Sequence, residues 1–511
     1  MKNMTRIFAV ALLTLVGVSA CTNLDESFKD RLTLDQVEAL TSGSEGADVS
    51  ALLNEAYLKL RDLQTQDLIY ATSEHTSDVV MGPTRGGDWD DNGMWRAMHQ
   101  HAWDPDHALV GNTFRSLASG LFAAIDLLQF NPNPQQAAEA RFLRALHVFF
   151  LTDGWGQVPM REPGAPLSEV PTVMSSSEAI NFVISELNAI MSSLPANGPA
   201  HQATQNAAHA LLAKAYLNKA VFESDDRQNF TFNAADMQQV IQHADAITAS
   251  GKYALEANYY KNFSHDNESS SEMIFSSQNI GGIAAGNVRG RWMAVLHYNQ
   301  VPSGWNGFTT IADFYNKFEA NDQRRQAEVP LLKQQTGLMA GFLAGQQYDK
   351  DGNQVLDRRG RPLVFTLESP IISSGELLEN SGIRPMKYIP NMEQEEVPNN
   401  DYAIFRYADV LLMKAEALLR TNNASQALSI VNQLRSVRGA SPLSTINLDV
   451  MVDERGRELW GEHWRRNDLV RFGKFLNAWN EKPASDPKYL LFPFPSSQIV
   501  ANPNLNQNPG Y

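Results

Sequence analysis

Apolar residues recur at spacings of three and four in several stretches of the chain, which predicts amphipathic helices. The clearest stretch is 402–438, where two striped segments are separated by a polar break at 421–423. Ala415 and Ala427 lie twelve positions apart, one in each segment, so two antiparallel helices can cross closely there. This spacing is typical of a tetratricopeptide-like hairpin. Because one hairpin cannot bury its own apolar face, we expect others to stack against it.

The same periodicity predicts three further hairpins. They pair 47–63 with 112–129, 135–151 with 177–194, and 203–221 with 234–249. Residues 251–400 lose this period and are rich in Gly, Ser, Asn and Pro, with short strand-like runs. We therefore predict a mainly α fold. Four tetratricopeptide-like helical hairpins form a scaffold (47–250 and 402–438), and a large loop-rich insertion (about 251–400) bears short strands and the binding surface.

The C-terminal part is highly charged. MVDERGRELWGEHWRRNDLVRFGKF, residues 451–475, predicts one long helix. Glu458 and His463 could be taken as an acid–base pair, but they are five positions apart and do not share a helix face well. We interpret this helix as a lock for the last segment, in which prolines and asparagines exclude regular structure over most of its length. Residues 47–511 are predicted to form a single domain.

Composition and the N-terminal sequence limit the class of partner and the cellular location of the protein. The chain has 511 residues, a formal net charge of −15 and one cysteine, Cys21. The acidic balance argues against a nucleic-acid partner. Cys21 follows a short basic start and the apolar run IFAVALLTLVGVSA, which is too short to span a membrane. VSAC matches a bacterial lipobox. We expect 1–20 to be a signal peptide and 21–46 a lipidated N-terminus and tether, with an ordinary signal peptide as the alternative.

Five stretches together resemble the SusD/RagB family. They are the lipobox at Cys21, AEARFLRALHVFFLTDGWGQVPM, RYADVLLMKAEALLR, ERGRELWGEHWRRNDLVRFGKF and PFPSSQIVANPNLNQNPGY. The resemblance implies a surface lipoprotein of Bacteroidetes, lipid-anchored in the cell outer membrane and facing outside. Asp25 and Glu26 are consistent with the acidic export signal of such lipoproteins. The resemblance also implies that the protein forms a lid on a SusC-type TonB-dependent transporter, binds glycans and is not an enzyme. Residues 450–511 correspond to the C-terminal segment of the family.

A glycan site needs exposed aromatic faces for the CH faces of sugars, and Asp, Asn or Arg for their hydroxyls. The candidates are Arg85, Asp88, Trp89 and Trp103 in the first loop (residues 72–111), and Trp292, Tyr298, Trp305 and Arg384 in or beside the insertion. Trp89 and Trp305 should form the centre, because both lie in glycine-rich, non-helical stretches. The alternatives are that such rings hold long loops to the scaffold and that Arg384 pairs with the acidic run at 392–396.

Motifs for catalysis are missing from the sequence. It contains no HExxH, GxSxG or GxxxxGK[ST] pattern. Asp349, Asp351 and Asn353 resemble the start of a calcium loop, but Gln354 and Gly360 occupy its sixth and twelfth positions, so a turn is predicted. We predict no catalytic residue, metal or cofactor. The predicted function is capture of oligo- or polysaccharide and its delivery to the transporter. Peptide capture, a glycoside hydrolase and a pure tetratricopeptide scaffold remain as alternatives.

Overall fold

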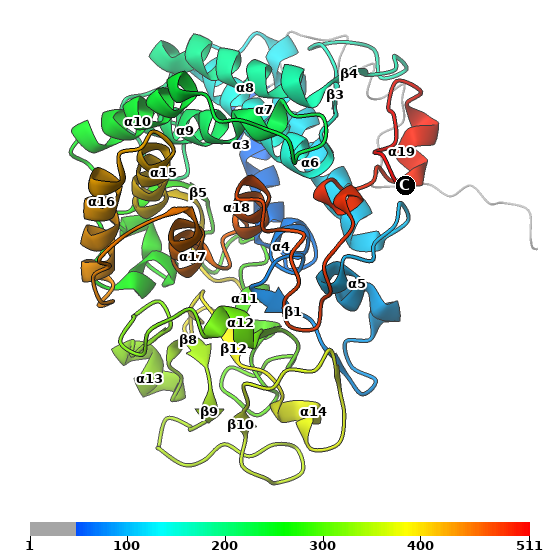
Figure 1. Cartoon of the computed structure of the whole chain (residues 1–511). Helices are drawn as coiled ribbons and strands as arrows, with labels where there is room; N and C mark the ends of the chain where they lie inside the picture. Colours follow the sequence, from blue (N-terminus) through cyan, green and yellow to red (C-terminus); the bar gives the residue numbers. More distant parts are fainter. Residues whose placement is uncertain (1–47) are drawn as a thin grey trace, which may run out of the picture. The chain divides into compact units, whose positions relative to one another are not determined.

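Long helices, each packed on its neighbours, form the upper half of the protein in Figure 1. The computed structural model describes residues 48–511, so Cys21 and the tether lie outside the described residues. The scaffold helices are α3 (Val49–Leu58), α6 (Ala108–Asp126), α7 (Pro134–Trp155), α8 (Ser176–Ile190), α9 (Gln205–Phe222), α10 (Ala234–Ala249), α15 (Tyr407–Arg420) and α16 (Ala424–Val437). Packing of α10 on α15 joins the scaffold across the insertion. The predicted mainly α fold is confirmed.

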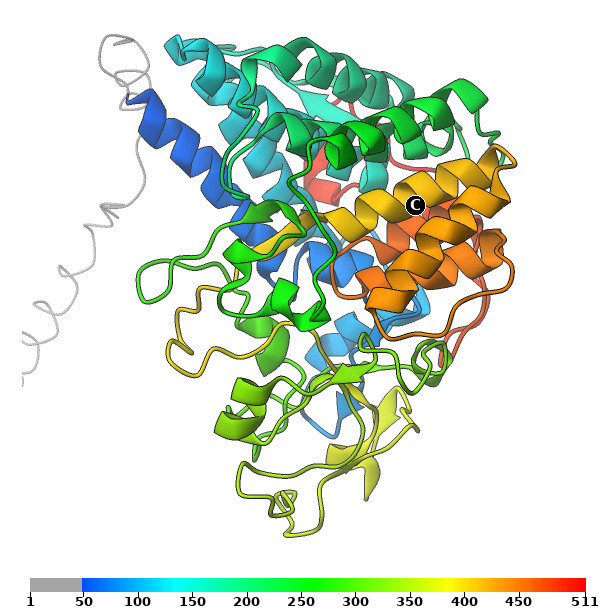
Figure 2. The ribbon, with the colours of Figure 1, turned by 90° about the vertical axis from the view of Figure 1, so that its left-hand side faces the viewer.

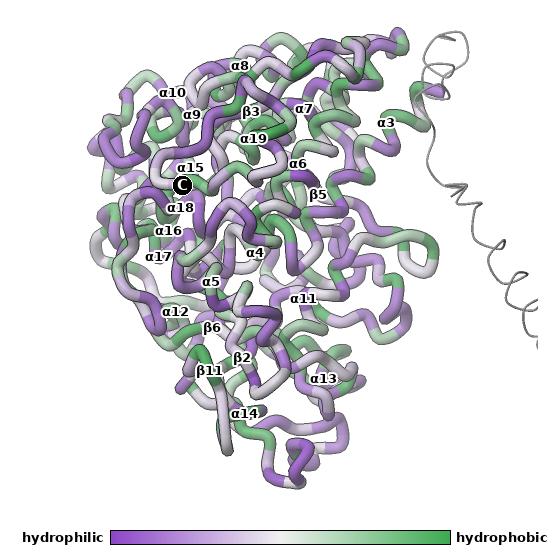
Figure 3. Tube along the Cα trace, turned by 90° about the vertical axis from the view of Figure 1, so that its right-hand side faces the viewer, coloured by the Kyte–Doolittle hydropathy of each residue, from purple (hydrophilic) through white to green (hydrophobic). Residues whose placement is uncertain are grey.

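Local chemistry explains where several of these helices begin. The Asn133 side chain accepts from the backbone N–H of Gln136, and the Gln136 side chain reaches back to Asn133. Ser175 and Glu178 form the same reciprocal cap at the start of α8. Pro134 occupies the first turn of α7, where no N–H is needed, so the NPNP run that ends one helical stretch also starts the next. Figure 3 shows hydrophobic and hydrophilic positions alternating along most of these helices.

One stretch of helix, Ala108–Phe130, is long and apolar enough to cross a membrane by length and composition. It is the single such stretch in the described part of the chain, and 56% of its most apolar window is buried inside the protein. That burial is typical of a core helix, because its apolar face packs on α7 and on α3 rather than facing outward.

Short elements make up the lower half and the connections. Within residues 48–511, the remaining α-helices are α4 (Ile69–Ser73), α5 (Met94–Gln100), α11 (Gly290–Met293), α12 (Ala312–Tyr315), α13 (Pro330–Thr336), α14 (Leu377–Asn380), α17 (Leu448–Leu459), α18 (Arg465–Arg471) and α19 (Ser496–Ala501). The strands pair as β3 (Val158–Met160) with β4 (Thr172–Met174), β5 (Met273–Ser277) with β13 (Tyr402–Arg406), β9 (Gly345–Gln346) with β10 (Val364–Phe365), and β7 (Gln326–Ala327) with β8 (Ala340–Leu343) and β12 (Arg384–Met386). All these pairs are antiparallel.

Two strand pairs bring the first loop against the insertion. β1 (Val80–Met81) runs antiparallel to β6 (Thr309–Thr310), and β2 (Thr84–Arg85) runs parallel to β11 (Ile372–Ser373). The two segments are far apart in sequence but lie together in the lower half, beneath the helices, as Figures 1 and 2 show. This pairing places the loop that carries Trp89 beside the loop that carries Trp305.

The predicted single helix over 451–475 is wrong. α17 ends at Leu459 and α18 begins at Arg465. Between them Gly461 and His463 adopt left-handed conformations, with φ of 74° and 61°. The buried carboxylate of Glu74 accepts the backbone N–H groups of Gly461 (3.1 Å) and His463 (2.8 Å), which fixes the break. Because Glu74 belongs to a distant part of the chain, periodicity alone could not show it.

Candidate functional site

Trp89 and Trp305 meet where the two loops come together. Arg85 and Asp88 close a two-residue turn over Gly86 and Gly87, with reciprocal backbone hydrogen bonds of 2.8 and 3.1 Å. The turn is followed at once by Trp89, which has a left-handed φ of 59°. Its indole packs so closely on Gly307 that a side chain there would collide with it.

The indoles of Trp89 and Trp305 form an aromatic surface, and Trp305 is the more exposed of the two. Trp89 Nε1 donates to the carbonyl of Trp305 at 2.9 Å, and the ring centroids are 6.5 Å apart at 44°. Phe308 supports Trp89 from behind, at 4.8 Å between centroids. Trp305 is 37% exposed, and Trp89 is half-buried. A flat ring therefore faces solvent, as stacking on a sugar requires.

Polar groups lie directly beside this surface. Tyr298 donates its hydroxyl to Asp88 Oδ2 at 2.9 Å. Burial, followed by the hydrogen bond to Asp88, raises the pKa of Tyr298 to about 12, so it remains a donor at neutral pH. The guanidinium carbon of Arg358 lies 4.1 Å from the Tyr298 ring centroid, and its Nη2 is 3.8 Å from Asp88 Oδ2. Asp88 and Arg358 are both well exposed, so the residue that precedes Trp89 and its guanidinium neighbour offer an acceptor and donors to solvent.

Glu379 and His297 lie behind Arg358. Glu379 Oε2 accepts from His297 Nε2 at 2.8 Å and from the backbone N–H of Arg358 at 3.0 Å, while Oε1 accepts from Arg358 Nε at 2.8 Å. Burial raises the pKa of Glu379, but the hydrogen bonds from Arg358 and His297 outweigh it and hold the pKa below its usual range. Burial lowers the pKa of His297 to about 4. The carboxylate is thus charged and the imidazole neutral at neutral pH.

Two predicted arginines are buried and hydrogen-bonded to the loops of the site rather than exposed. Arg85 is buried and donates to the carbonyl oxygens of Gly307, Leu378 and Ser381. Arg384 is fully buried and donates to backbone carbonyls and to Asn306 Oδ1 at 2.7 Å. The alternative pairing of Arg384 with the acidic run at 392–396 is not seen either, since Glu395 and Glu396 face Arg289. Both guanidiniums therefore donate their hydrogen bonds to the loops that carry the aromatic surface.

Two predicted tryptophans also need correction. Trp103 is 2% exposed, donates to the Tyr511 hydroxyl at 2.9 Å and packs on Tyr489 and Phe492. Trp292 in α11 is fully buried. Neither ring has a free face for a sugar, because the C-terminal segment covers Trp103 and Trp292 is part of the main hydrophobic core. For these two rings, the alternative that they hold loops in place is the better account.

Arg358, Glu379 and His297 are the residues at this site that sequence reasoning missed. Arg358 lies in DRRGRP of the β9–β10 hairpin, inside the stretch 349–360 for which the sequence predicts a turn and no binding residue. The signal available was a cluster of arginines in an exposed loop of the insertion. Nothing in the sequence indicated that this turn reaches Tyr298 and Asp88.

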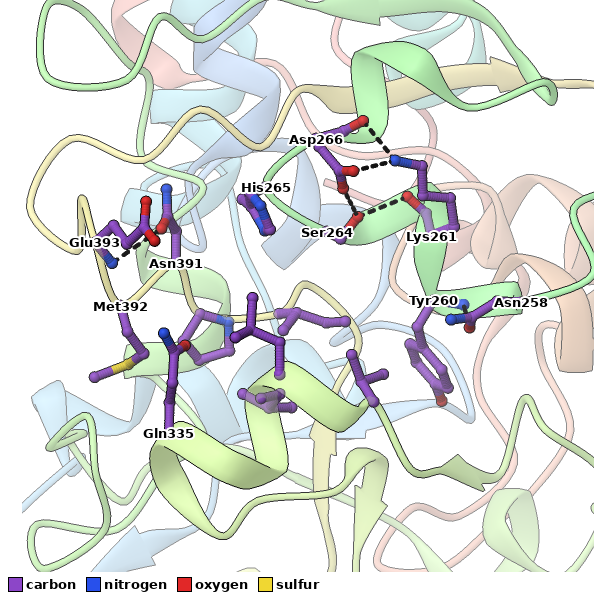
Figure 4. Close-up of a pocket in the computed structure, with 15 residues that line it drawn as sticks. Asn258, Tyr260, Lys261, Ser264, His265, Asp266, Gln335, Asn391, Met392 and Glu393 are labelled. Carbon is purple, nitrogen blue, oxygen red and sulfur yellow. Dashed lines mark hydrogen bonds and ion pairs between the residues drawn. The ribbon is translucent and has the colours of Figure 1, made fainter. Parts of the chain in front are cut away.

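One hollow elsewhere on the protein has a different lining. Figure 4 shows this hollow, of about 180 Å³, with a polar wall of Lys261, Ser264 and Asp266. Its tyrosine, Tyr260, is buried and donates to the Arg324 carbonyl, so this hollow has no exposed tryptophan or tyrosine face. Within residues 48–511, no three His, Cys, Asp or Glu side chains are grouped so as to hold a metal ion.

Comparison with known proteins gives the family. The model of the SusD family matches residues 214–511, more than half of the chain, and the chain belongs to this family. The starch-binding protein SusD of Bacteroides thetaiotaomicron is 26% identical over 421 residues, which cover 74% of this chain and 73% of that protein.

Solved structures show the same fold. A SusD superfamily protein from Parabacteroides distasonis superposes with a TM-score of 0.69 at 18% identity, covering 94% of this chain and all of the other. A laminarin-binding SusD-like protein gives a TM-score of 0.68 at 20% identity, covering 91% of this chain and 99% of the other.

Proposed function

We propose that this protein binds a glycan at the surface formed by Trp89, Trp305, Tyr298, Asp88 and Arg358. The observation that carries the proposal is the exposed Trp305 ring, which is joined through its carbonyl to Trp89, the residue that follows the exposed Asp88 carboxylate and its Arg358 neighbour. A sugar ring stacks its CH face on an indole and satisfies its hydroxyls with such groups. The proposal is supported by membership of the SusD family and by relatives named for binding starch and laminarin.

A binding screen tests this function. Purified protein should be retarded in native gels that contain at least one of soluble starch, laminarin, xyloglucan, levan and arabinan. Calorimetry should then confirm binding of that polysaccharide. A tryptic digest of casein serves as the peptide probe. Binding of peptides with no retention by any polysaccharide would overturn the proposal. Chromatography of the bound glycan after a day should show no shortening, because we propose binding without catalysis. Shortened products would favour the hydrolase alternative.

The proposal extends to the place of binding. Cys21 would carry the lipid that anchors the protein in the outer membrane, facing outside, and the captured glycan would pass to a SusC-type TonB-dependent transporter. The lipobox and the family resemblance support this step. Cys21→Ala should release the protein from membrane fractions of a native host, and wild type should co-purify with a large barrel protein in mild detergent. A variant that stays with the membrane, or repeated failure to recover a barrel, would contradict it.

A further inference from the structure

We infer that Arg358 is a specificity-determining residue of this glycan site and that buried Glu379 is its positioning residue. Arg358 would donate to one of two neighbouring hydroxyls on the sugar that lies against Trp305, while Asp88 accepts from the other. This inference rests on the proposed function and adds to it a residue from a separate loop. Arg358 and Asp88 are 270 positions apart, yet Nη2 and Oδ2 lie within 3.8 Å.

The hairpin that carries Arg358 holds it in a fixed turn. Asp357 Oδ1 accepts the backbone N–H groups of Arg359 and Arg361, both at 2.9 Å, and Asp357 Oδ2 accepts from Arg361 Nε at 2.9 Å. Asn299 Nδ2 donates to the Leu356 carbonyl at 2.8 Å, which ties the hairpin to the loop of Tyr298. The turn is therefore organised before any ligand arrives, which lowers the entropy cost of binding.

Glu379 sets the direction of the guanidinium. Its side chain is 4% exposed, so it has almost no surface with which to contact a ligand. One carboxylate oxygen accepts Arg358 Nε, and the other accepts the Arg358 backbone N–H and His297 Nε2. This arrangement holds the backbone and the Nε of the arginine and places the guanidinium over the Tyr298 ring, with Nη2 toward Asp88.

Arg358 and Asp88 each keep a hydrogen-bonding group that has no partner in the part of the chain that the structure describes. Within residues 48–511, Arg358 Nη1 donates no hydrogen bond, and Asp88 Oδ1 accepts none. Asp88 and Arg358 have side chains that are 53% and 46% exposed, so both groups are open to a ligand. A guanidinium only donates and a carboxylate only accepts, whereas a hydroxyl does both. Two adjacent sugar hydroxyls therefore match this pair.

A matched pair of hairpin variants tests the role of Arg358. The probe is the polysaccharide from the screen that wild type retains most strongly. Arg358→Ala should weaken its binding by about tenfold or more, the range for a hydrogen bond to a charged group. Arg359→Ala removes the same charge one position away. The Arg359 side chain makes no hydrogen bond or ion pair in the described structure, so this control should bind within about twofold of wild type. Arg358→Lys should not restore full affinity, because an ammonium lacks the planar fork.

A double-mutant cycle tests the role of Glu379. Glu379→Gln should weaken binding by roughly threefold to tenfold in the wild-type background but by less than about twofold in the Arg358→Ala background, since it acts through the arginine. A general effect on the fold would appear in both backgrounds. Melting temperatures are measured alongside. If Glu379→Gln does not fold, the comparison of Arg358→Ala with Arg359→Ala still decides the inference.

The outcomes separate this inference from the proposed function. If wild type binds a glycan and Trp305→Ala weakens binding, but Arg358→Ala binds like Arg359→Ala, the inference is overturned and the function stands. An equal effect of Glu379→Gln in both backgrounds overturns the positioning role. If wild type binds none of the polysaccharides, the proposed function fails and this inference fails with it.

Discussion

Trp305 is held by its backbone rather than by its side chain. Its N–H donates to the Met293 carbonyl at 2.6 Å, and its own carbonyl accepts the Trp89 indole N–H at 2.9 Å. The ring itself is left partly in solvent. The loop can therefore keep its conformation when the ring is removed, which makes Trp305 a better probe of binding than a buried tryptophan.

Trp305→Ala should weaken glycan binding by about 30- to 1000-fold, the effect of roughly 2–4 kcal/mol expected for an aromatic hot spot. We expect little change in the melting temperature, because the ring contributes little to the core. Trp103→Ala is the control. This ring is buried, so its loss should cost about 3–5 kcal/mol of unfolding free energy and leave the affinity of the folded protein unchanged. Calorimetry that places Trp305→Ala within threefold of wild type would contradict the site.

The sequence predicts part of this site and not the rest for a physical reason. Trp89, Trp305, Tyr298 and Asp88 lie in polar, glycine-rich stretches, where exposure can be inferred locally. The burial of Trp103 cannot be inferred in that way, because it depends on Tyr511 at the far end of the chain. The position of Arg358 likewise depends on Glu379, which a turn pattern does not indicate.

Helix α17 shows how a charged element can be buried. Glu458 on this helix faces Arg438 at 2.9 Å, Arg406 at 3.1 Å and Arg324 at 3.3 Å, and all four side chains are fully enclosed. Burial raises the pKa of Glu458, but the guanidiniums outweigh it and hold the pKa far below its usual range. α17 therefore connects to β13, to the end of α16 and to the insertion through buried charges, in addition to the apolar packing of Met451 on α16.

Glu458→Gln should lower the unfolding free energy by about 3–5 kcal/mol, because it leaves buried guanidiniums without their shared carboxylate. Asp449→Asn on the same helix is the control. Asp449 is exposed and pairs with Lys474 at 2.8 Å, so its loss should cost no more than about 1 kcal/mol. Urea unfolding measures both. Equal effects of the two substitutions would mean that the buried network does not stabilise the fold as argued.

The helical hairpins were predictable because their signals are local. Apolar spacing within 402–438 and polar residues at the turns specify α15 and α16 without reference to other segments. The break between α17 and α18 depends instead on Glu74, 387 and 389 positions away from the two amides that it accepts. Elements fixed by their own periodicity are visible in a sequence, whereas a break fixed by a distant carboxylate is not.

At the scale of the whole molecule, buried histidines link stability to pH. Ten histidines have pKa values below the usual range, mainly because burial disfavours their charged form, and those of His99, His147, His243 and His297 fall to about 4. The unfolded chain binds these protons near pH 6.5, before the folded protein does. Stability is therefore lost as the pH falls from about 6.5 toward 4.

Two buried carboxyl groups act in the opposite direction. Burial raises the pKa of Glu74 to about 7 and that of Asp401 to about 6, so the folded protein takes up these protons first. Their contribution to stability grows as the pH falls through those values.

Glu416 and Glu454 add a third effect. Their pKa values are held at about 2, because nearby guanidiniums outweigh burial, so their contribution is lost below pH 4.5.

The unfolding free energy should therefore fall on acidification in two stages. Ten histidines outweigh two carboxyl groups, so we expect a loss of roughly 2 kcal/mol or more between pH 7.5 and 5, and a steeper loss below pH 4.5 as the paired carboxylates must be protonated. Urea unfolding at closely spaced pH values measures both stages.

His147→Gln is the matched variant, because the His147 ring is enclosed against Gly120 and Leu143, away from the glycan site. Its proton uptake on unfolding at pH 5 should be smaller by about one proton. An unfolding free energy that is equal or higher at pH 5 than at pH 7.5 would show that the histidines do not dominate this range.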